Sequence, residues 1–197
     1  MSIFSFYLKL GITHILNLEA LDHILFIAAL VAVYMINDWK KIIFLATAFT
    51  IGHTTTLALA TLNIIRVPSA LIEFLIAATI FLTGFGNLFK IKEEFSKPLH
   101  NIKYLIAMFF GLIHGMGFSN TLRYMLGMEQ NLWKPLLAFN IGIEIGQIIL
   151  ITIFLTVEFI LVRYLRVKQR EWNLVLSGMA MGVSLLMMLE RYSAAFS

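Results

Sequence analysis

Long apolar runs separated by short polar or basic segments make up most of the chain. Six of these runs approach the roughly 20 residues that a helix needs to cross a bilayer. We expect transmembrane helices over about residues 21–36, 42–64, 70–89, 104–119, 136–162 and 172–189. The pattern therefore predicts an all-α, polytopic transmembrane helical bundle that forms a single transmembrane domain over residues 1–197.

The segment over residues 3–18 is apolar but different from the six runs, because Lys9 interrupts it. At about 1.5 Å per residue it is also short for a membrane span. We expect a short interfacial or half-inserted helix, kinked near Gly11 or Asn17, that leads into the first span. If this segment crossed the membrane, the number of spans would be seven instead of six.

The composition supports a membrane protein and excludes several other classes. Hydrophobic residues make up 60% of the chain and charged residues only 13%, whereas soluble domains carry about 25% charged residues. The net charge of +4 comes from basic loops, which orient membrane proteins, so we expect no nucleic-acid partner. The chain contains no cysteine, which excludes disulfides and thiolate metal ligands.

The basic residues also predict an orientation. Ten lysines and arginines lie in the loops after the first, third and fifth spans, and five lie on the other side. Under the positive-inside rule, this difference places both termini outside. We therefore expect a multi-pass protein of the bacterial inner (cytoplasmic) membrane with both termini in the periplasm.

Ionisable residues recur within the predicted spans, where such groups are costly and by default indicate function. Asp22 and His23 begin the first span, and His53 lies near the middle of the second. His114 and Glu144 lie in the outer halves of the fourth and fifth spans. These side chains share a mid-to-outer depth, so we expect them to form one site.

Imidazole and carboxylate groups suit Ni, Co, Zn, Mn or non-haem Fe as ligands. The predicted metal ligands are His14, Asp22, His23, His53, His114 and Glu144, and the supporting residues are Thr50, Glu73, Asn140 and Gln147. The structural alternative is that these groups only join helices by hydrogen bonds, but repeated carboxylates are costly in that role. His14 equally fits an interfacial histidine, and Glu73 equally fits a carboxylate that reaches the membrane surface.

Three Gly-x-x-x-Gly pairs accompany these residues: Gly111/Gly115, Gly142/Gly146 and Gly178/Gly182. Small residues at this spacing let helix backbones approach closely in lipid. Two pairs bracket His114 and Glu144, so close helix packing would bring those side chains toward one point. The same faces would also allow a homo-oligomer.

Four motifs resemble the HupE/UreJ family of membrane proteins. The matching segments are residues 10–15 with 21–26, 47–54 with 57–60, 110–118 and 139–147, in the order that the family shows. They include the Leu21-Asp22-His23 and Ile113-His114-Gly115 sequences. The resemblance implies a small integral membrane protein linked to nickel or cobalt uptake.

The leading functional hypothesis is a divalent transition-metal permease of the nickel/cobalt type, with its His/carboxylate site in the outer half of the bundle. Asp22, Glu73 and Glu144 are candidates to exchange protons for the ion, since ligands must deprotonate to bind. The chain has no P-loop motif, so flux would follow the membrane potential, a proton gradient or a partner. The inner half of the fifth span is almost wholly apolar, which argues against a transport path there.

Two alternatives remain open. An intramembrane enzyme could hold Zn or Fe and act as a hydrolase or oxidoreductase on a lipid or membrane substrate. In that case Glu144 or Asp22 would serve as the general base. A metal-stabilised scaffold would need only helix packing.

Overall fold

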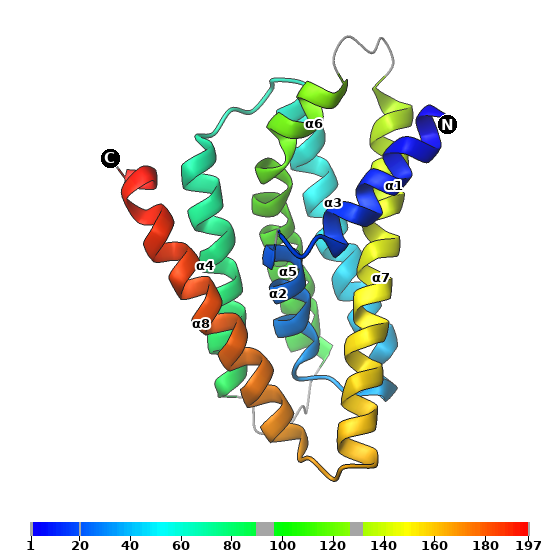
Figure 1. Ribbon diagram of the computed structural model, residues 1–197, viewed down its shortest axis with the longest axis vertical. Helices are drawn as coiled ribbons and strands as arrows, with labels where there is room; N and C mark the ends of the chain where they lie inside the picture. Colours follow the sequence, from blue (N-terminus) through cyan, green and yellow to red (C-terminus); the bar gives the residue numbers. More distant parts are fainter. Residues whose placement is uncertain (1, 20, 90–96, 127–131, 197) are drawn as a thin grey trace.

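The computed structural model describes residues 2–19, 21–89, 97–126 and 132–196, in which every regular element is helical. Figure 1 shows the long helices running along the long axis of the molecule, whereas the first helix and a short helix over residues 119–126 are inclined to it. The helices are α1 (Ile3–Leu16), α2 (Leu21–Val31), the 3₁₀ helix η1 (Ile36–Asp38), α3 (Trp39–Thr61), α4 (Ser69–Leu88), α5 (Lys97–Gly117), α6 (Ser119–Leu126), α7 (Trp133–Arg163) and α8 (Gln169–Phe196). The all-α bundle expected from the sequence is confirmed.

Among the described residues, four helices are long and apolar enough to cross a membrane by themselves, namely Ile36–Thr61, Ser69–Leu88, Trp133–Arg163 and Gln169–Phe196. Two bent pairs pass the same test when their members are taken together. Helices α1 and α2 meet at 65°, and residues 102–117 of α5 meet α6 at 49°. If each pair is one broken span, the described residues contain six spans. The chain is thus a multi-pass membrane protein.

The N-terminal region differs in detail from the sequence expectation. Helix α2 ends at Val31, although the first span was expected to continue to residue 36. At 11 residues it is roughly 17 Å long, too short to cross a bilayer alone. Helix α1, which begins after the capping side chain of Ser2, packs along α7. Helices α1 and α2 are therefore successive parts of one bent pair.

The C-terminal half also differs at two loops. Helix α5 begins at Lys97, within a segment that was expected to be a polar loop up to residue 103. Pro98 lies in the first turn of α5, where a missing backbone N–H breaks no helical hydrogen bond. A second expected loop, directly after the fourth span, contains the short helix α6.

Three closely packed helix pairs surround the short helix α2: α3 with α5, α4 with α8, and α1 with α7 (Figure 1). Glycines permit the close approach in lipid. A Cβ atom at Gly52 of α3 would lie 2.0 Å from the carbonyl oxygen of Met108, and one at Gly111 of α5 would lie 2.1 Å from that of Phe49. The two backbones are therefore in contact.

The backbones of α1 and α7 also approach closely at glycines. A Cβ atom at Gly11 would lie 2.1 Å from the carbonyl oxygen of Phe139, and one at Gly142 would lie 2.2 Å from that of Leu8. Two of the three predicted glycine pairs thus pack helices within the chain. The third does not, since no atom lies within 4 Å of a Cβ placed at Gly178 or Gly182.

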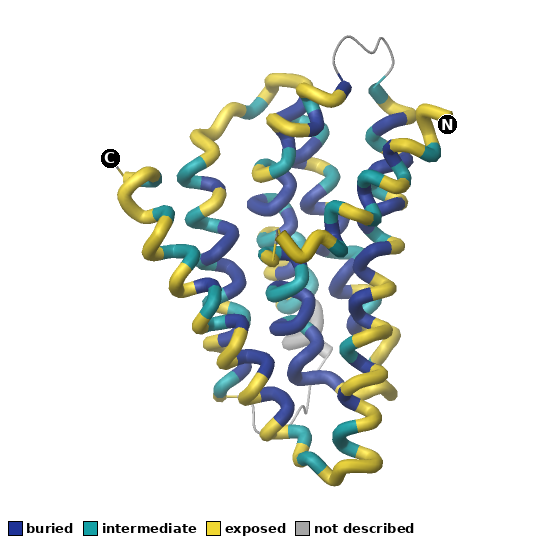
Figure 2. Tube along the Cα trace, viewed as in Figure 1, coloured by how far each residue is buried: buried dark blue, intermediate teal, exposed yellow. Residues whose placement is uncertain are grey.

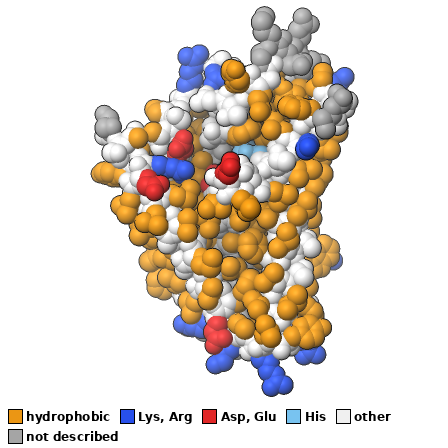
Figure 3. Space-filling view, in the orientation of Figure 1, with side chains coloured by type: hydrophobic (Ala, Val, Ile, Leu, Met, Phe, Trp, Pro, Cys, Tyr) orange, Lys and Arg blue, Asp and Glu red, His pale blue; other side chains and the backbone are white. Residues whose placement is uncertain are grey.

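Both ends of the bundle are polar, and the surface between them is apolar. Figure 2 shows buried residues on the inward faces of the helices, and Figure 3 shows hydrophobic side chains covering most of the surface between the ends. Phe44 and Ile153, for example, are 63% and 51% exposed. Both termini lie at the end that carries the 62–68 loop, here called the terminal end. The end with η1 and the 164–168 loop is called the basic end, after its lysines and arginines.

Candidate metal centre

Four helices bring four histidines together in the middle of the bundle. His14 lies in the last turn of α1 and His23 in the first turn of α2, while His53 and His114 lie in α3 and α5. The His23 ring centroid is 4.6 Å from that of His14, 5.9 Å from that of His53 and 5.5 Å from that of His114. Asp22 joins the group, with its Oδ1 atom 3.3 Å from Nδ1 of His23. These five residues are called the histidine cluster.

Within the histidine cluster, two sets of side chains are close enough to share an ion. His14, His23 and His53 offer ligand atoms that all lie within 4.8 Å of one another, and so do Asp22, His23 and His114. Ligand nitrogens about 2.1 Å from a tetrahedral ion lie roughly 3.4 Å apart. Small side-chain rotations would therefore close either set around a metal. His23 belongs to both sets.

The histidine cluster is buried, yet each of its four histidines has a ring nitrogen without a hydrogen-bond partner. His23, His53 and His114 are 3%, 0% and 1% exposed. Of ten buried side-chain polar atoms without a hydrogen-bond partner in the described part of the chain, seven belong to the cluster, and two of these seven, Oδ1 of Asp22 and Nδ1 of His23, lie 3.3 Å from each other as an ion pair. Buried polar groups in native proteins are nearly always hydrogen-bonded, and unpaired ones are destabilising. The donor set therefore fits a bound cation.

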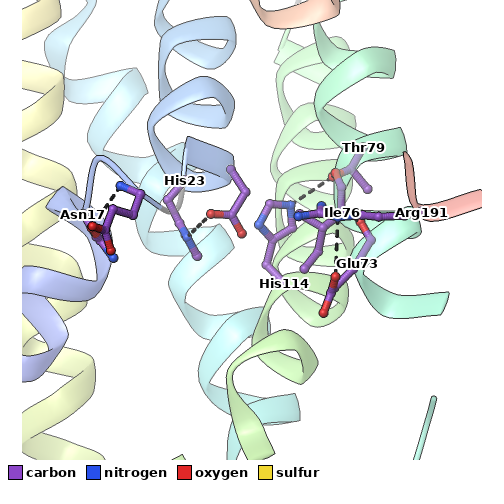
Figure 4. Close-up of polar contacts among 9 residues, drawn as sticks. Asn17, His23, Glu73, Ile76, Thr79, His114 and Arg191 are labelled. Carbon is purple, nitrogen blue, oxygen red and sulfur yellow. Dashed lines mark hydrogen bonds and ion pairs between the residues drawn. The ribbon is translucent and has the colours of Figure 1, made fainter. Parts of the chain in front are cut away.

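One contact determines which nitrogen of His114 is available. The hydroxyl of Thr79 donates to the carbonyl of Ile76 at 2.7 Å and lies 2.9 Å from Nε2 of His114. A hydroxyl has one proton, so we assign the proton of the second contact to Nε2 of the histidine. That tautomer leaves the lone pair of Nδ1, an atom without a partner, free for a metal. Figure 4 shows Thr79 beside His114.

A cavity of about 490 Å³ reaches the histidine cluster from the surface. Its lining includes His14, Asp22, His23 and His114, together with Glu19, Glu73 and Arg191. Figure 3 shows the hollow among acidic and basic side chains, with histidine at its floor. Arg191 lies with Nε 3.4 Å from a carboxylate oxygen of Glu73 (Figure 4). Glu73, expected as a supporting residue, thus lies in the wall of the approach to the cluster.

The polar residues of α7 form a separate arrangement with threonines of α3. Three threonine hydroxyls donate across the interface: Thr47 to Glu144 at 2.6 Å, Thr50 to Gln147 at 2.9 Å, and Thr54 to Asn140. These six residues are called the threonine seam. Glu144, expected as a ligand, belongs to neither set of potential metal ligands. The seam instead fixes α7 against the helix that carries His53.

Sequence reasoning missed some residues of the site. It assigned no role to Thr47, although residues 47, 50 and 54 share one face of a helix. Sequence reasoning also gave Thr79 no part in the site, because Thr79 and His114 are 35 residues apart in the chain and lie on different helices. Phe49 and Phe118, whose rings lie 5.0 Å from His114 and 4.2 Å from His14, offered no signal in an apolar run.

Comparison with known proteins identifies the family. Searches of curated proteins and of solved structures found no significant match. A family model described as HupE / UreJ protein matches residues 1–192, which include every residue of the histidine cluster and of the threonine seam. Because the match covers nearly the whole chain, the protein belongs to the HupE/UreJ family.

Proposed function

We propose that the protein is a divalent transition-metal permease of the nickel/cobalt type, and that the histidine cluster is its ion-binding site. One observation carries the proposal: His14, His23, His53, His114 and Asp22 converge from four helices, each histidine has a ring nitrogen without a hydrogen-bond partner, and all of these residues except His53 line one cavity. Membership of the HupE/UreJ family supports nickel or cobalt as the ion. Imidazole and carboxylate donors also suit these two metals, as well as zinc and iron.

The charge balance of the cluster favours transient binding. Four imidazoles bind a metal as neutral ligands, so Asp22 is the single anionic donor in the two sets. A divalent ion would keep a net positive charge in an apolar surrounding. Conduction requires a site that the ion can leave as well as enter. An ion whose charge is only partly neutralised by its ligands is held less tightly, so it can leave the site.

The approach to the cluster is suited to cations. Glu19 and Glu73 line the cavity with Asp22, and clefts lined by one sign of charge raise the local concentration of the opposite ion. Arg191 reduces the negative electrostatic potential of the cavity through its ion pair with Glu73. The acidic surplus remains, and it favours entry of a metal ion from the terminal end.

The alternative of an intramembrane hydrolase or oxidoreductase has less support. A hydrolase needs a carboxylate beside the metal to act as general base. Asp22 already belongs to a ligand set, and Glu144 accepts a hydrogen bond from Thr47. Retention of the metal separates the two functions, because an enzyme keeps its ion through turnover and a permease must release it.

The test is uptake of Ni²⁺ or Co²⁺ into proteoliposomes that contain a metal-sensitive dye, combined with calorimetric binding to the purified protein. We expect uptake by the wild type and none by His23→Ala, with a loss of affinity above about 100-fold, since losing a residue that only hydrogen-bonds to a ligand already costs about 10- to 100-fold. Glu190→Gln, an exposed carboxylate of α8, serves as the control. Stoichiometric metal that survives a chelator wash, without uptake, would contradict the permease and favour an enzyme.

A further inference from the structure

A layer of phenylalanines lies directly below the histidine cluster. Three helices each carry a histidine and a phenylalanine three or four residues away: His23 and Phe26 in α2, His53 and Phe49 in α3, and His114 and Phe110 in α5. Helix α2 runs toward the basic end, whereas α3 and α5 run away from it (Figure 1). In all three helices the phenylalanine therefore lies one turn closer to the basic end than its histidine. Phe26, Phe49 and Phe110 are called the phenylalanine layer.

The phenylalanine layer is tightly packed and touches the cluster. Phe26 and Phe49 are 2% and 1% exposed, and their rings stack at 4.7 Å. The ring of Phe110 lies edge-on to that of Phe26 at 6.3 Å. Phe26 and Phe49 also lie 5.3 Å and 5.0 Å from the ring of His114.

A second cavity, of about 310 Å³, lies on the other side of the layer. Phe26 and Phe110 line it, together with Thr83 and Asn87 of α4 and Lys103 of α5. His114 lines the first cavity together with Glu73 and Arg191 of the terminal half, and Phe26 lines the second cavity, which lies nearer the basic end. Because Phe26 contacts His114, the two cavities are separated by one layer of side chains.

We propose that the phenylalanine layer is the barrier in the ion path, and that the second cavity is the chamber into which the ion leaves the histidine cluster. This inference rests on the proposed permease function. Hydrophobic constrictions block ions because they exclude the water that an ion carries. A movement of Phe26 or Phe110 would connect the two cavities without displacing a metal ligand.

The lining of the second cavity is consistent with release. The hydroxyl of Thr83 and the amide of Asn87 are neutral, Lys103 is cationic, and no carboxylate or imidazole belongs to the described lining. The chamber therefore has no set of ligands with which to hold a divalent ion. It would let a rehydrated ion pass on toward the basic end.

The natural absence of cysteine makes the barrier directly testable by thiol accessibility. Thr83→Cys places one thiol in the second cavity, with a side chain close in size to threonine. The protein is reconstituted in vesicles, and protease cleavage of a C-terminal tag reports which end faces outward. A membrane-impermeant methanethiosulfonate is then applied from either side.

We expect the thiol to react from the basic end and to stay protected from the terminal end. Adding Phe26→Ala should raise the rate from the terminal end by at least about tenfold, because the dewetted barrier is removed. Phe26→Leu, which keeps most of the bulk, should raise it less. Phe85→Ala, at a 45% exposed position of α4, is the matched control and should leave the rate unchanged.

Three outcomes would overturn the inference. The thiol of Thr83→Cys could react equally from both sides without any second substitution, or stay protected from the terminal end after both Phe26→Ala and Phe110→Ala. It could also react only with a membrane-soluble maleimide, which would identify the cavity as lipid-filled.

If Phe26→Ala does not fold, the rate measured with Phe110→Ala tests the barrier in its place. Binding of Co²⁺ to each variant separates a failed barrier from a failed metal site.

Discussion

A buried histidine can bind a metal only if one ring nitrogen keeps a free lone pair, and a neighbour usually decides which one. Thr79 does this for His114, because its own proton is already committed to the carbonyl of Ile76. The hydroxyl then accepts a hydrogen bond from Nε2. At the scale of the residue, this contact orients a ring that packs mainly against phenylalanines.

Replacing Thr79 by valine should weaken the metal site without removing a ligand. The change keeps the shape of the side chain but removes the acceptor for Nε2 of His114, and loss of such a partner lowers metal affinity by about 10- to 100-fold. Calorimetric titration with Co²⁺ measures the effect. Thr79→Ser should retain affinity, and Thr83→Val, one turn along α4, is the control. Equal affinity of Thr79→Val and wild type would contradict the assigned tautomer.

At the scale of the element, the position of each histidine depends on how closely its helix approaches the next. Helix α5 lies against α3 through Gly111 and Gly115, where added Cβ atoms would lie 2.1 Å from the carbonyl oxygens of Phe49 and His53. The glycines therefore set the separation between the helices that carry His53 and His114.

Gly111→Ala should destabilise the bundle and weaken metal binding together. The new methyl group would overlap the carbonyl of Phe49, so α3 and α5 must separate, and overpacking of this kind typically costs 1–3 kcal/mol. Thermal unfolding in detergent and Co²⁺ titration provide the two measurements. Gly178→Ala is the matched control, because its Cβ would meet no atom within 4 Å. If Gly111→Ala had the same melting temperature and the same Co²⁺ affinity as the wild type, the close packing of α3 and α5 would be refuted.

The short helix α2 ends inside the protein, where its last carbonyl groups need partners. The carbonyl of Ala29 receives a hydrogen bond of 2.7 Å from the side-chain amide of Asn87, which is 2% exposed. Asn87 also donates to Ser177 of α8 at 3.1 Å. One asparagine therefore joins the end of α2 to α4 and α8.

Asn87→Leu should lower the free energy of unfolding by about 1–3 kcal/mol, since a buried carbonyl is left without a donor. The melting temperature of the purified protein would fall accordingly, and metal affinity would fall with it if α2 shifts. Asn120→Ala, at an exposed position of α6, should change stability by less than about 0.5 kcal/mol. A leucine variant as stable as wild type would show that the end of α2 finds another donor.

At the scale of the whole molecule, both termini lie at one end of the bundle and the basic loops at the other. The path from the first cavity, past the phenylalanine layer, to the second cavity runs between these two ends. Orientation in the membrane then decides the direction of entry. The excess of lysine and arginine at the basic end predicts that this end faces the cytoplasm.

Reporter fusions would test this orientation. A C-terminal alkaline phosphatase, which is active only outside the cytoplasm, should be active, and the same enzyme inserted in the 164–168 loop should be inactive. Green fluorescent protein at the two positions should give the opposite pattern. An inactive C-terminal phosphatase beside a fluorescent C-terminal fusion would reverse the predicted topology and place the acidic cavity on the cytoplasmic side.

The sequence by itself determined the class of protein and marked all five residues of the histidine cluster as candidate ligands. Apolar runs are properties of the chain alone, so they predicted the helical membrane bundle and left errors mainly at helix ends, as at Val31 and Lys97. The cost of ionisable groups in lipid likewise marked His23, His53 and His114 without any knowledge of their neighbours.

Only the tertiary structure decided which of these side chains meet. Distance along a helix predicts depth in the membrane but not the direction in which a side chain points, and lipid is as apolar as the protein interior, so apolar periodicity does not mark the inward face. Glu144 and His114 have similar expected depths, yet one contacts Thr47 and the other joins the histidine cluster. Helix rotation separates them, and contacts between distant helices, through glycines such as Gly111 and Gly142, set that rotation.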